Sequence, residues 1–193
     1  MTSQPTLLLA SSSPRRREIL NALRLRFSVQ VNDVNERALP DESADQLVLR
    51  LAEAKSCAAV CGPDDFVIGA DTAVVLDDDV LGKPIGKEAA IAMLLRLSGR
   101  SHHVVTAVAL RGPHGVDTAM SRTRVDFREI TRDEAVAYWQ SGEPRDKAGA
   151  YGIQGLGGLF VCGIDGSYSG VVGLPVFETA ELLANAGFDL LRM

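Results

Sequence analysis

Residues 7–17 read LLLASSSPRRR, an apolar run followed by small polar residues, a proline and three arginines. A fully apolar run of this length predicts a buried strand, and a serine before a proline is typical of the start of a helix. Ser13 is therefore the expected N-cap, and Ile19, Leu20 and Leu23 fall on one face of the helix. A buried strand that passes through a short polar loop into a helix is the building unit of α/β proteins, so this stretch predicts the fold class.

The same alternation of strands and helices continues along the chain. Apolar or alternating segments predict strands at residues 27–31, 66–70, 73–76, 102–110, 116–127 and 159–164. Helix-start signals and apolar spacing predict helices at residues 43–60, 87–97, 131–140 and 175–187. The pattern predicts one α/β domain over residues 1–193, with a mixed central sheet, flanking helices and two lobes around a groove.

The composition argues against several classes of binding protein. The net charge is −5 at pH 7, which disfavours a nucleic-acid coat or a polybasic membrane anchor. Aromatic residues make up only 5% of the chain, too few for the stacking platforms of single-strand-binding proteins. The sequence has no signal-peptide pattern and no long apolar run, so we expect a cytoplasmic protein that does not span a membrane.

The three cysteines and the paired histidines are expected to be structural. Cys57, Cys61 and Cys162 lack the spacing of a zinc site, and we expect them to be small buried thiols in a reducing compartment. His102 and His103 begin a predicted strand, without a serine or cysteine motif that would make them catalytic.

Positive charge gathers near the start of this acidic chain. Residues 1–30 contain five arginines and one glutamate. The loop before the first helix offers free backbone N–H groups and the positive end of the helix dipole, which together favour an anion. We expect Ser11, Ser13 and Arg15 to bind a phosphate, whereas Arg16 and Arg17 fit a solvated helix face equally well.

Asp71 is the strongest catalytic candidate. It directly follows the apolar strand at 66–70, at the edge where open α/β sheets bind ligands, so it is expected either to bind a divalent cation or to activate water. The alternative is a carboxylate that caps a turn. Glu36 follows the second strand and either shares a cation with Asp71 or is a solubilising loop residue.

Two lysines are candidates for the same region. Lys55 lies on the apolar stripe of helix 43–60, so it either extends toward solvent or meets an anion. Lys83 follows the acidic hairpin turn at 77–79 and is expected to reach the region around Asp71. It is not a P-loop lysine, because Pro84 follows it and the spaced glycines of that motif are missing.

The segment at 141–155 is rich in glycine and in charges of alternating sign. Glycines allow the backbone to approach a ligand closely, and Gln154 offers both a donor and an acceptor to the edge of a base. A flexible surface loop is the alternative.

Five motifs, in order along the chain, resemble the Maf family of nucleoside triphosphate pyrophosphatases. They are Leu9-Ala10-Ser11-Ser12-Ser13-Pro14-Arg15-Arg16, Gly69-Ala70-Asp71-Thr72, Gly82-Lys83-Pro84, Asp146-Lys147-Ala148-Gly149-Ala150-Tyr151 and the stretch from Gly166-Ser167-Tyr168 to Pro175. The stretch from Asp146 to Gly155 resembles the subgroup that acts on dTTP and UTP. The resemblance implies a mixed α/β fold related to that of the inosine triphosphatases.

The resemblance also implies roles for individual residues. Asp71 would be the proton acceptor, and Arg15, Thr72 and Gln154 would match the positions that set base specificity. Other polar site positions of the family are matched by Glu36, Lys55 and Lys83. A divalent cation, Mg²⁺ or Mn²⁺, would be the cofactor, and Glu36 and Asp71 would hold it.

The implied activity is hydrolysis of nucleoside triphosphates to the monophosphate and pyrophosphate, a house-cleaning of nucleotide pools that is linked to cell-division arrest. Nucleoside triphosphates would be the partners, with neither nucleic acid nor membrane, and a homodimer is the default form of self-association. A non-catalytic nucleotide-binding regulator of septum formation is the alternative function.

Overall fold

The computed structural model describes residues 6–191, which form two compact units. Of the described residues, unit 1 comprises 6–71, Thr106–Ser121 and 173–191, and unit 2 comprises Thr72–Val105 and Arg122–Val172. The expected groove between two lobes, and the expectation of a single domain over residues 1–193, stay predictions.

Three long strands contribute to both units, namely β3 (Phe66–Leu76), β5 (Ser101–Gly112) and β6 (Gly115–Phe127). The other elements of unit 1 are β1 (Leu7–Leu9), α1 (Pro14–Ala22), β2 (Ser28–Val29), α2 (Ala44–Ala58) and α6 (Val176–Asn185). Unit 2 adds β4 (Asp79–Leu81), α3 (Lys87–Leu97), α4 (Arg132–Gln140), β7 (Val161–Asp165) and α5 (Tyr168–Val172). It also contains three short 3₁₀ helices, η1 (Glu143–Asp146), η2 (Ala148–Ala150) and η3 (Leu156–Phe160).

The strands form the mixed sheet that the sequence predicted. Their order is β2-β1-β3-β5-β6-β7, and β4 pairs with β3. Strand β1 is parallel to both β2 and β3, with Leu9 opposite Ile68, whereas β4 and β7 are antiparallel to their partners. The fold class is therefore confirmed as α/β with a mixed central sheet and flanking helices.

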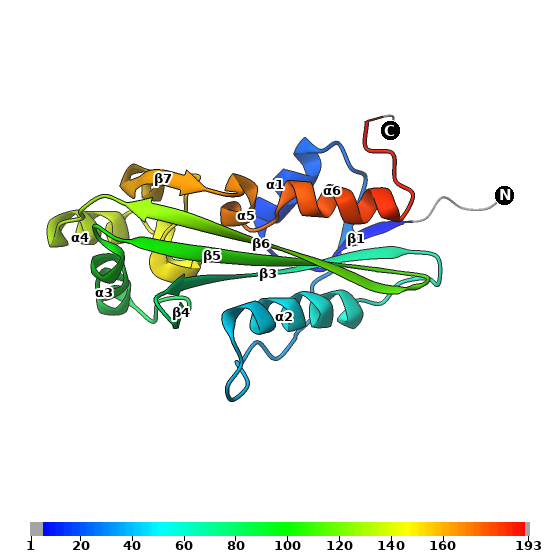
Figure 1. The fold of residues 1–193 in the computed structure, drawn as a ribbon, viewed down its shortest axis with the longest axis horizontal. Helices are drawn as coiled ribbons and strands as arrows, with labels where there is room; N and C mark the ends of the chain where they lie inside the picture. Colours follow the sequence, from blue (N-terminus) through cyan, green and yellow to red (C-terminus); the bar gives the residue numbers. More distant parts are fainter. Residues whose placement is uncertain (1–5, 192–193) are drawn as a thin grey trace. The chain divides into compact units, whose positions relative to one another are not determined.

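Helices cover both faces of the unit 1 strands, with α1 and α6 on one face and α2 on the other (Figure 1). The alternation of side chains along a strand explains this division. Ile68 and Ala70 of β3 pack in the cluster that contains Leu20 and Leu183 from α1 and α6. Val67, which points the opposite way, packs against Ala59 at the end of α2. Both faces of β3 are thus buried in unit 1.

Unit 2 has its own core, formed by α3, α4 and aromatic side chains. His102 is 1% exposed, and its Nε2 lies 2.8 Å from the Tyr151 hydroxyl oxygen. The His102 ring also packs edge-to-face against Phe127 and Tyr151. Burial lowers the pKa of His102 to about 4. The expected structural role of this histidine is confirmed.

Helices with local start and stop signals were predicted closely. Helix α3 begins and ends at the predicted residues, and Gly99, with φ +66°, follows its end. The capping boxes at Ser43 and Thr131 both form, with side chain and backbone paired reciprocally. Helix α2 ends at Ala58, however, and its buried face runs through Val48, Ala52 and Ser56.

Four expectations were wrong. Strand β3 does not end at Asp71 but continues to Leu76, because Ala73 to Leu76 are buried and extend the same ladder. The second strand is only two residues long, and the glycine-rich region contains 3₁₀ helices and α5 that were not predicted. Cys57 and Cys162 are exposed and Cys61 is half-buried, all three with free thiols, so the cysteines are not small core residues.

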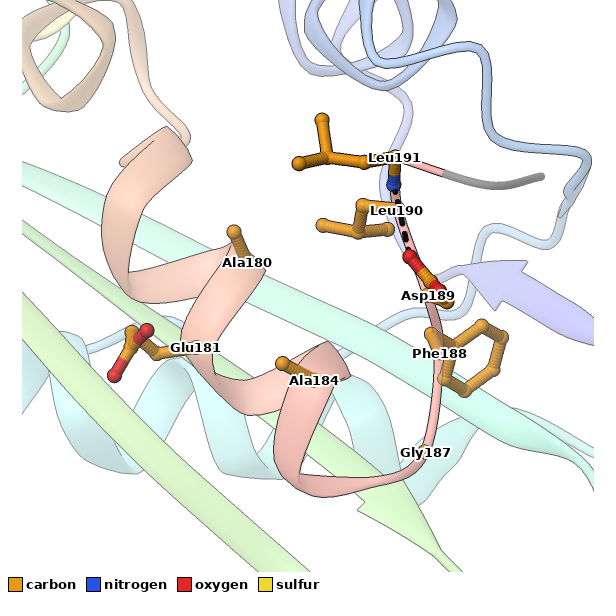
Figure 2. A pocket seen from close by; sticks show the side chains of 8 residues that line it. All are labelled: Ala180, Glu181, Ala184, Gly187, Phe188, Asp189, Leu190 and Leu191. Atoms are coloured by element: carbon orange, nitrogen blue, oxygen red, sulfur yellow. Dashed lines mark hydrogen bonds between the residues drawn. The ribbon is translucent and has the colours of Figure 1, made fainter.

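None of the helices in residues 6–191 combines the length and the apolar character needed to cross a membrane. Unit 1 has a pocket beside the end of α6, lined by Ala180, Glu181, Ala184, Gly187, Phe188, Asp189, Leu190 and Leu191 (Figure 2). The pocket contains none of the predicted site residues.

Candidate active site

Two of the predicted site residues in unit 1, Glu36 and Asp71, contact the ammonium group of a third, Lys55. Its Nζ lies 2.7 Å from Asp71 Oδ1 and 2.5 Å from Glu36 Oε1. The side chains of Lys55 and Asp71 are only 14% and 15% exposed, whereas that of Glu36 is 54% exposed. Of the two alternatives for Lys55, contact with an anion is confirmed. Two carboxylates converge on one cation.

A glycine explains how Lys55 reaches Asp71. Gly69 and Asp71 lie two positions apart in β3, so they face the same side of the sheet, the side covered by α2. A Cβ atom on Gly69 would lie 2.6 Å from the backbone nitrogen of Ser56, and still closer to the Ala52 carbonyl oxygen. Only a residue without a side chain lets α2 lie this close to β3. Lys55 precedes Ser56 and is thereby brought to Asp71.

The loop that joins β1 to α1 is organised by Ser11 and Arg16. Ser11 Oγ accepts hydrogen bonds from the Ser13 backbone N–H and from Arg16 Nη1, both at 3.2 Å. Arg16 Nε donates to the carbonyl oxygen of Gly173 at 2.7 Å. Ser13 occupies the predicted N-cap position, but its side chain makes no capping hydrogen bond. Ser11, rather than Ser13, shapes the loop.

Arg16 is a site residue that sequence reasoning left open. Burial lowers the pKa of its guanidinium, the Asp71 and Glu36 carboxylates act to raise it, and Arg15 acts to lower it. Because Arg16 is also half-buried and bonds to Ser11 and Gly173, a purely solvated helix face is the wrong interpretation of this residue. Arg15 is half-buried in the first turn of α1. The motif that contains both arginines could be recognised in the sequence, but the different contacts of Arg15 and Arg16 could not be predicted from it.

The remaining predicted residues lie in unit 2. Thr72 follows Asp71 in β3 and is half-buried, and Lys83 is exposed in the loop after β4. The Lys83 loop lies beside the glycine-rich segment, because the Gly149 N–H donates to the Gly82 carbonyl oxygen at 3.1 Å. Gly149 has φ +69°, and a Cβ there would meet the Val74 side chain at 3.0 Å. The two motifs are thus packed together.

Gln154 is exposed in a turn that closes from the Gly155 N–H to the Gly152 carbonyl oxygen at 3.4 Å. The backbone on both sides of this turn is hydrogen-bonded to Tyr138 and Glu143. A flexible surface loop is therefore the wrong interpretation of this segment. Tyr138 and Glu143 were not singled out from the sequence, although Glu143 lies inside the segment that was.

The donor set of Glu36 and Asp71 fits a hard divalent cation. Their oxygens already gather around one positive charge, that of Lys55. Within residues 6–191, no group of three or more His, Cys, Asp and Glu side chains is arranged to hold a metal ion. A magnesium ion is commonly bound by only one or two carboxylates together with substrate phosphates and water, so two protein carboxylates suffice for such a site.

Comparisons with known proteins show which family the chain resembles. A family model described as Maf-like protein matches residues 6–186. A dTTP/UTP pyrophosphatase from Colwellia psychrerythraea is 50% identical, over 97% of this chain and 91% of its own. A dTTP/UTP pyrophosphatase from Myxococcus xanthus is 51% identical, over 97% and 95% of the two chains. Among solved structures, a HAM1 protein from Coxiella burnetii matches with a TM-score of 0.46 and 16% identity, over 67% of this chain and 74% of that one.

Proposed function

Because this chain belongs to the Maf family, we propose that it is a nucleoside triphosphate pyrophosphatase that hydrolyses dTTP and UTP. Support comes from relatives of that name that are about half identical to it along nearly the whole of both chains. The observation that carries the proposal is that the little-exposed Asp71 carboxylate and the Glu36 carboxylate both pair with the ammonium group of Lys55. The products are the nucleoside monophosphate and pyrophosphate.

The proposed reaction is an in-line attack of water on the α-phosphorus. A bond forms between the water oxygen and the α-phosphorus, and the bond from that phosphorus to the oxygen bridging to the β-phosphorus breaks. Asp71 accepts the proton of the attacking water, and pyrophosphate leaves with the electron pair of the broken bond. Lys55 holds the Asp71 carboxylate in place through its 2.7 Å contact with Oδ1.

Cationic groups and N–H donors would bind the triphosphate. Ser11, Ser13 and Arg15 lie in the loop at the start of α1, where backbone N–H groups and the helix dipole favour an anion. Arg16 keeps this loop in shape through its bonds to Ser11 and Gly173. Lys83 would add a positive charge for the departing pyrophosphate.

Glu36 and Asp71 would hold a divalent cation, Mg²⁺ or Mn²⁺. When bound, the cation would supply positive charge to the phosphate oxygens and hold the triphosphate in an orientation suited to in-line attack. The two carboxylates are the residues of this chain that would select a hard ion of this kind.

Selection of a pyrimidine base is assigned to Gln154, with Thr72 and Arg15 as further specificity positions. The Gln154 amide can donate to a base carbonyl and accept from the N3–H of thymine or uracil. Cytosine carries no N3–H, so it would lose the second of these bonds. Hydrolysis of these triphosphates would clear them from nucleotide pools.

The purified protein should be tested on unmodified, methylated and otherwise modified nucleoside triphosphates, each with Mg²⁺, with Mn²⁺ and without metal. We expect pyrophosphate release from dTTP and UTP that requires a divalent cation and exceeds release from CTP, purine nucleotides and 7-methyl-GTP. Binding of dTTP without any release of pyrophosphate would instead support the non-catalytic regulator of septum formation. Release of single phosphates would contradict the proposed site of attack.

A further inference from the structure

Gln154 is carried by a turn that has no regular secondary structure of its own. Residues 152–155 form the turn, and the 3₁₀ helix η3 begins directly after it, at Leu156. Gln154 is exposed, so packing of its own side chain does not set its position. The position of its amide must be set by whatever holds the backbone on the two sides of the turn.

Two side chains from outside the turn hold both of its sides. Before the turn, the Gly152 N–H donates to the Tyr138 hydroxyl oxygen at 3.1 Å. After the turn, the Leu156 N–H donates to Glu143 Oε2 at 2.8 Å, and the Gly157 N–H donates to Oε1 at 3.1 Å. The Tyr138 hydroxyl in turn donates to Glu143 Oε1 at 2.7 Å. Tyr138 and Glu143, which are hydrogen-bonded to each other, therefore hold the backbone on both sides of the turn.

Two glycines beside the turn pack closely against this pair. A Cβ on Gly157 would lie 2.6 Å from the Tyr138 hydroxyl oxygen, and one on Gly155 would lie 2.7 Å from Glu143 Oε1. Both distances are shorter than real Cβ contacts. The glycines thus serve close packing of the turn against Tyr138 and Glu143.

The protonation states of the pair suit these contacts. Burial acts to raise the pKa of Glu143, but hydrogen bonds from Tyr138, Gly157 and Leu156 outweigh it and lower the pKa below its ordinary value. Burial and the bond to Glu143 raise the pKa of Tyr138. At neutral pH the carboxylate is therefore ionised and accepts three hydrogen bonds, while the phenol keeps its proton and donates one of them.

We propose that Tyr138 and Glu143 are positioning residues for base selection, which hold the turn at 152–155 so that Gln154 can recognise the pyrimidine. The inference rests on the proposed function and on the role assigned there to Gln154. Neither side chain touches the reacting phosphate; both act through the backbone of the turn.

The test compares Tyr138→Phe and Glu143→Gln with the wild type on dTTP, UTP and CTP in the presence of Mg²⁺. Each variant keeps the size of the side chain and removes a hydroxyl or a negative charge from the pair. We expect the preference for dTTP over CTP in kcat/KM to fall about tenfold, mainly through a higher KM for dTTP, because misplaced positioning groups weaken recognition without removing the reacting groups.

A double-mutant cycle distinguishes positioning from general damage. In a Gln154→Ala background, Glu143→Gln should cause no further change in the preference for dTTP, because the group on which it acts is already gone. Glu134→Gln is the matched control, since Glu134 lies on the same helix as Tyr138 but bonds to Thr131 and Arg128. It should lower the melting temperature and leave the preference unchanged.

Amide hydrogen exchange measures how firmly the backbone of the turn is held, and it requires no substrate. The Gly152 amide should exchange faster in Tyr138→Phe, and the Leu156 and Gly157 amides should exchange faster in Glu143→Gln. Unaltered exchange, an unaltered preference in both variants, or an equal change in Glu134→Gln would each overturn the inference. A wild-type protein that releases no pyrophosphate from dTTP or UTP would overturn the proposed function, and amide exchange would still decide whether the pair holds the turn.

Discussion

Asp71 and Lys55 are charged side chains that are largely removed from solvent and pair with each other. Asp71 lies within a strand whose neighbouring positions are mostly buried, and Lys55 lies beside the buried face of α2. Charges held at 14% and 15% exposure require a partner, because an unpaired charge removed from water is strongly destabilising. Each residue therefore supplies the opposite charge that the other needs.

Asp71→Asn tests the proton acceptor. We expect the rate of pyrophosphate release from dTTP to fall by at least about 10²-fold, the usual contribution of a general base, since an amide cannot take up the proton. Asp77→Asn is the matched control, because Asp77 lies in the exposed hairpin turn and pairs with Arg100. The control should keep its activity. Near-normal turnover by Asp71→Asn would show that another group accepts the proton.

At the scale of elements, the site depends on how closely α2 approaches β3. Gly69 allows this approach, and the ion pair between Lys55 and Asp71 lies directly beside it. The motif Gly69-Ala70-Asp71-Thr72 thus contains both the glycine that allows α2 to pack closely and the carboxylate that pairs with Lys55. Ala70 belongs to the opposite face, where it packs with α1 and α6.

Gly69→Ala should damage both packing and activity. The added methyl group would overlap the α2 backbone, so the helix must move away from β3 and Lys55 must move away from Asp71. We expect the free energy of unfolding to fall by about 1–3 kcal/mol, the usual cost of overpacking a core. We also expect the kcat for dTTP to fall at least about tenfold, because small displacements of catalytic groups are costly.

Gly112→Ala is the control for this change. A Cβ at Gly112 would meet the Phe66 ring at 2.5 Å, which also overpacks unit 1, but in the cluster that packs against α1 and α6. Chemical denaturation and kinetics should be measured on both variants. Equal losses of kcat at equal losses of stability would contradict a specific role for the approach of α2.

At the scale of the whole molecule, one buried histidine links stability to pH. Burial lowers the pKa of His102 to about 4, His103 acts in the same direction, and Asp126 opposes them. The ordinary value is 6.5, so between pH 6.5 and 4 the unfolded chain binds more protons than the folded one. The stability that the neutral ring contributes is therefore present above pH 6.5 and is lost as the pH falls toward 4.

We expect this residue to account for about 3 kcal/mol of the decrease in the free energy of unfolding between pH 6.5 and pH 4. His102→Gln should remove that part of the pH dependence, because glutamine does not titrate. His114→Gln, in the exposed turn between β5 and β6, should leave it unchanged. Urea unfolding followed by fluorescence of the single tryptophan, Trp139 of unit 2, measures the effect. A slope that is the same in all three proteins would refute the assignment.

Local sequence patterns were sufficient to predict the fold class, most of the helices and the candidate site residues. Capping boxes, helix-ending glycines and apolar periodicity act within a few residues, so α3 and the starts of α2 and α4 could be predicted without tertiary information. The motifs also placed Asp71, Lys55 and Glu36 among the candidates before any contact between them was known.

Which of these groups contact one another depends on how distant elements pack together. Arg16 bonds to Gly173, which lies 157 positions away, and no local pattern distinguishes it from Arg15. The hydrogen bonds from the turn at 152–155 to Tyr138 and Glu143 depend on how α4, η1 and η3 pack. The exposure of the three cysteines likewise depends on which elements lie around them. Local signals reflect the conformational preferences of neighbouring residues, whereas a site is made by distant residues whose contact depends on how the elements pack.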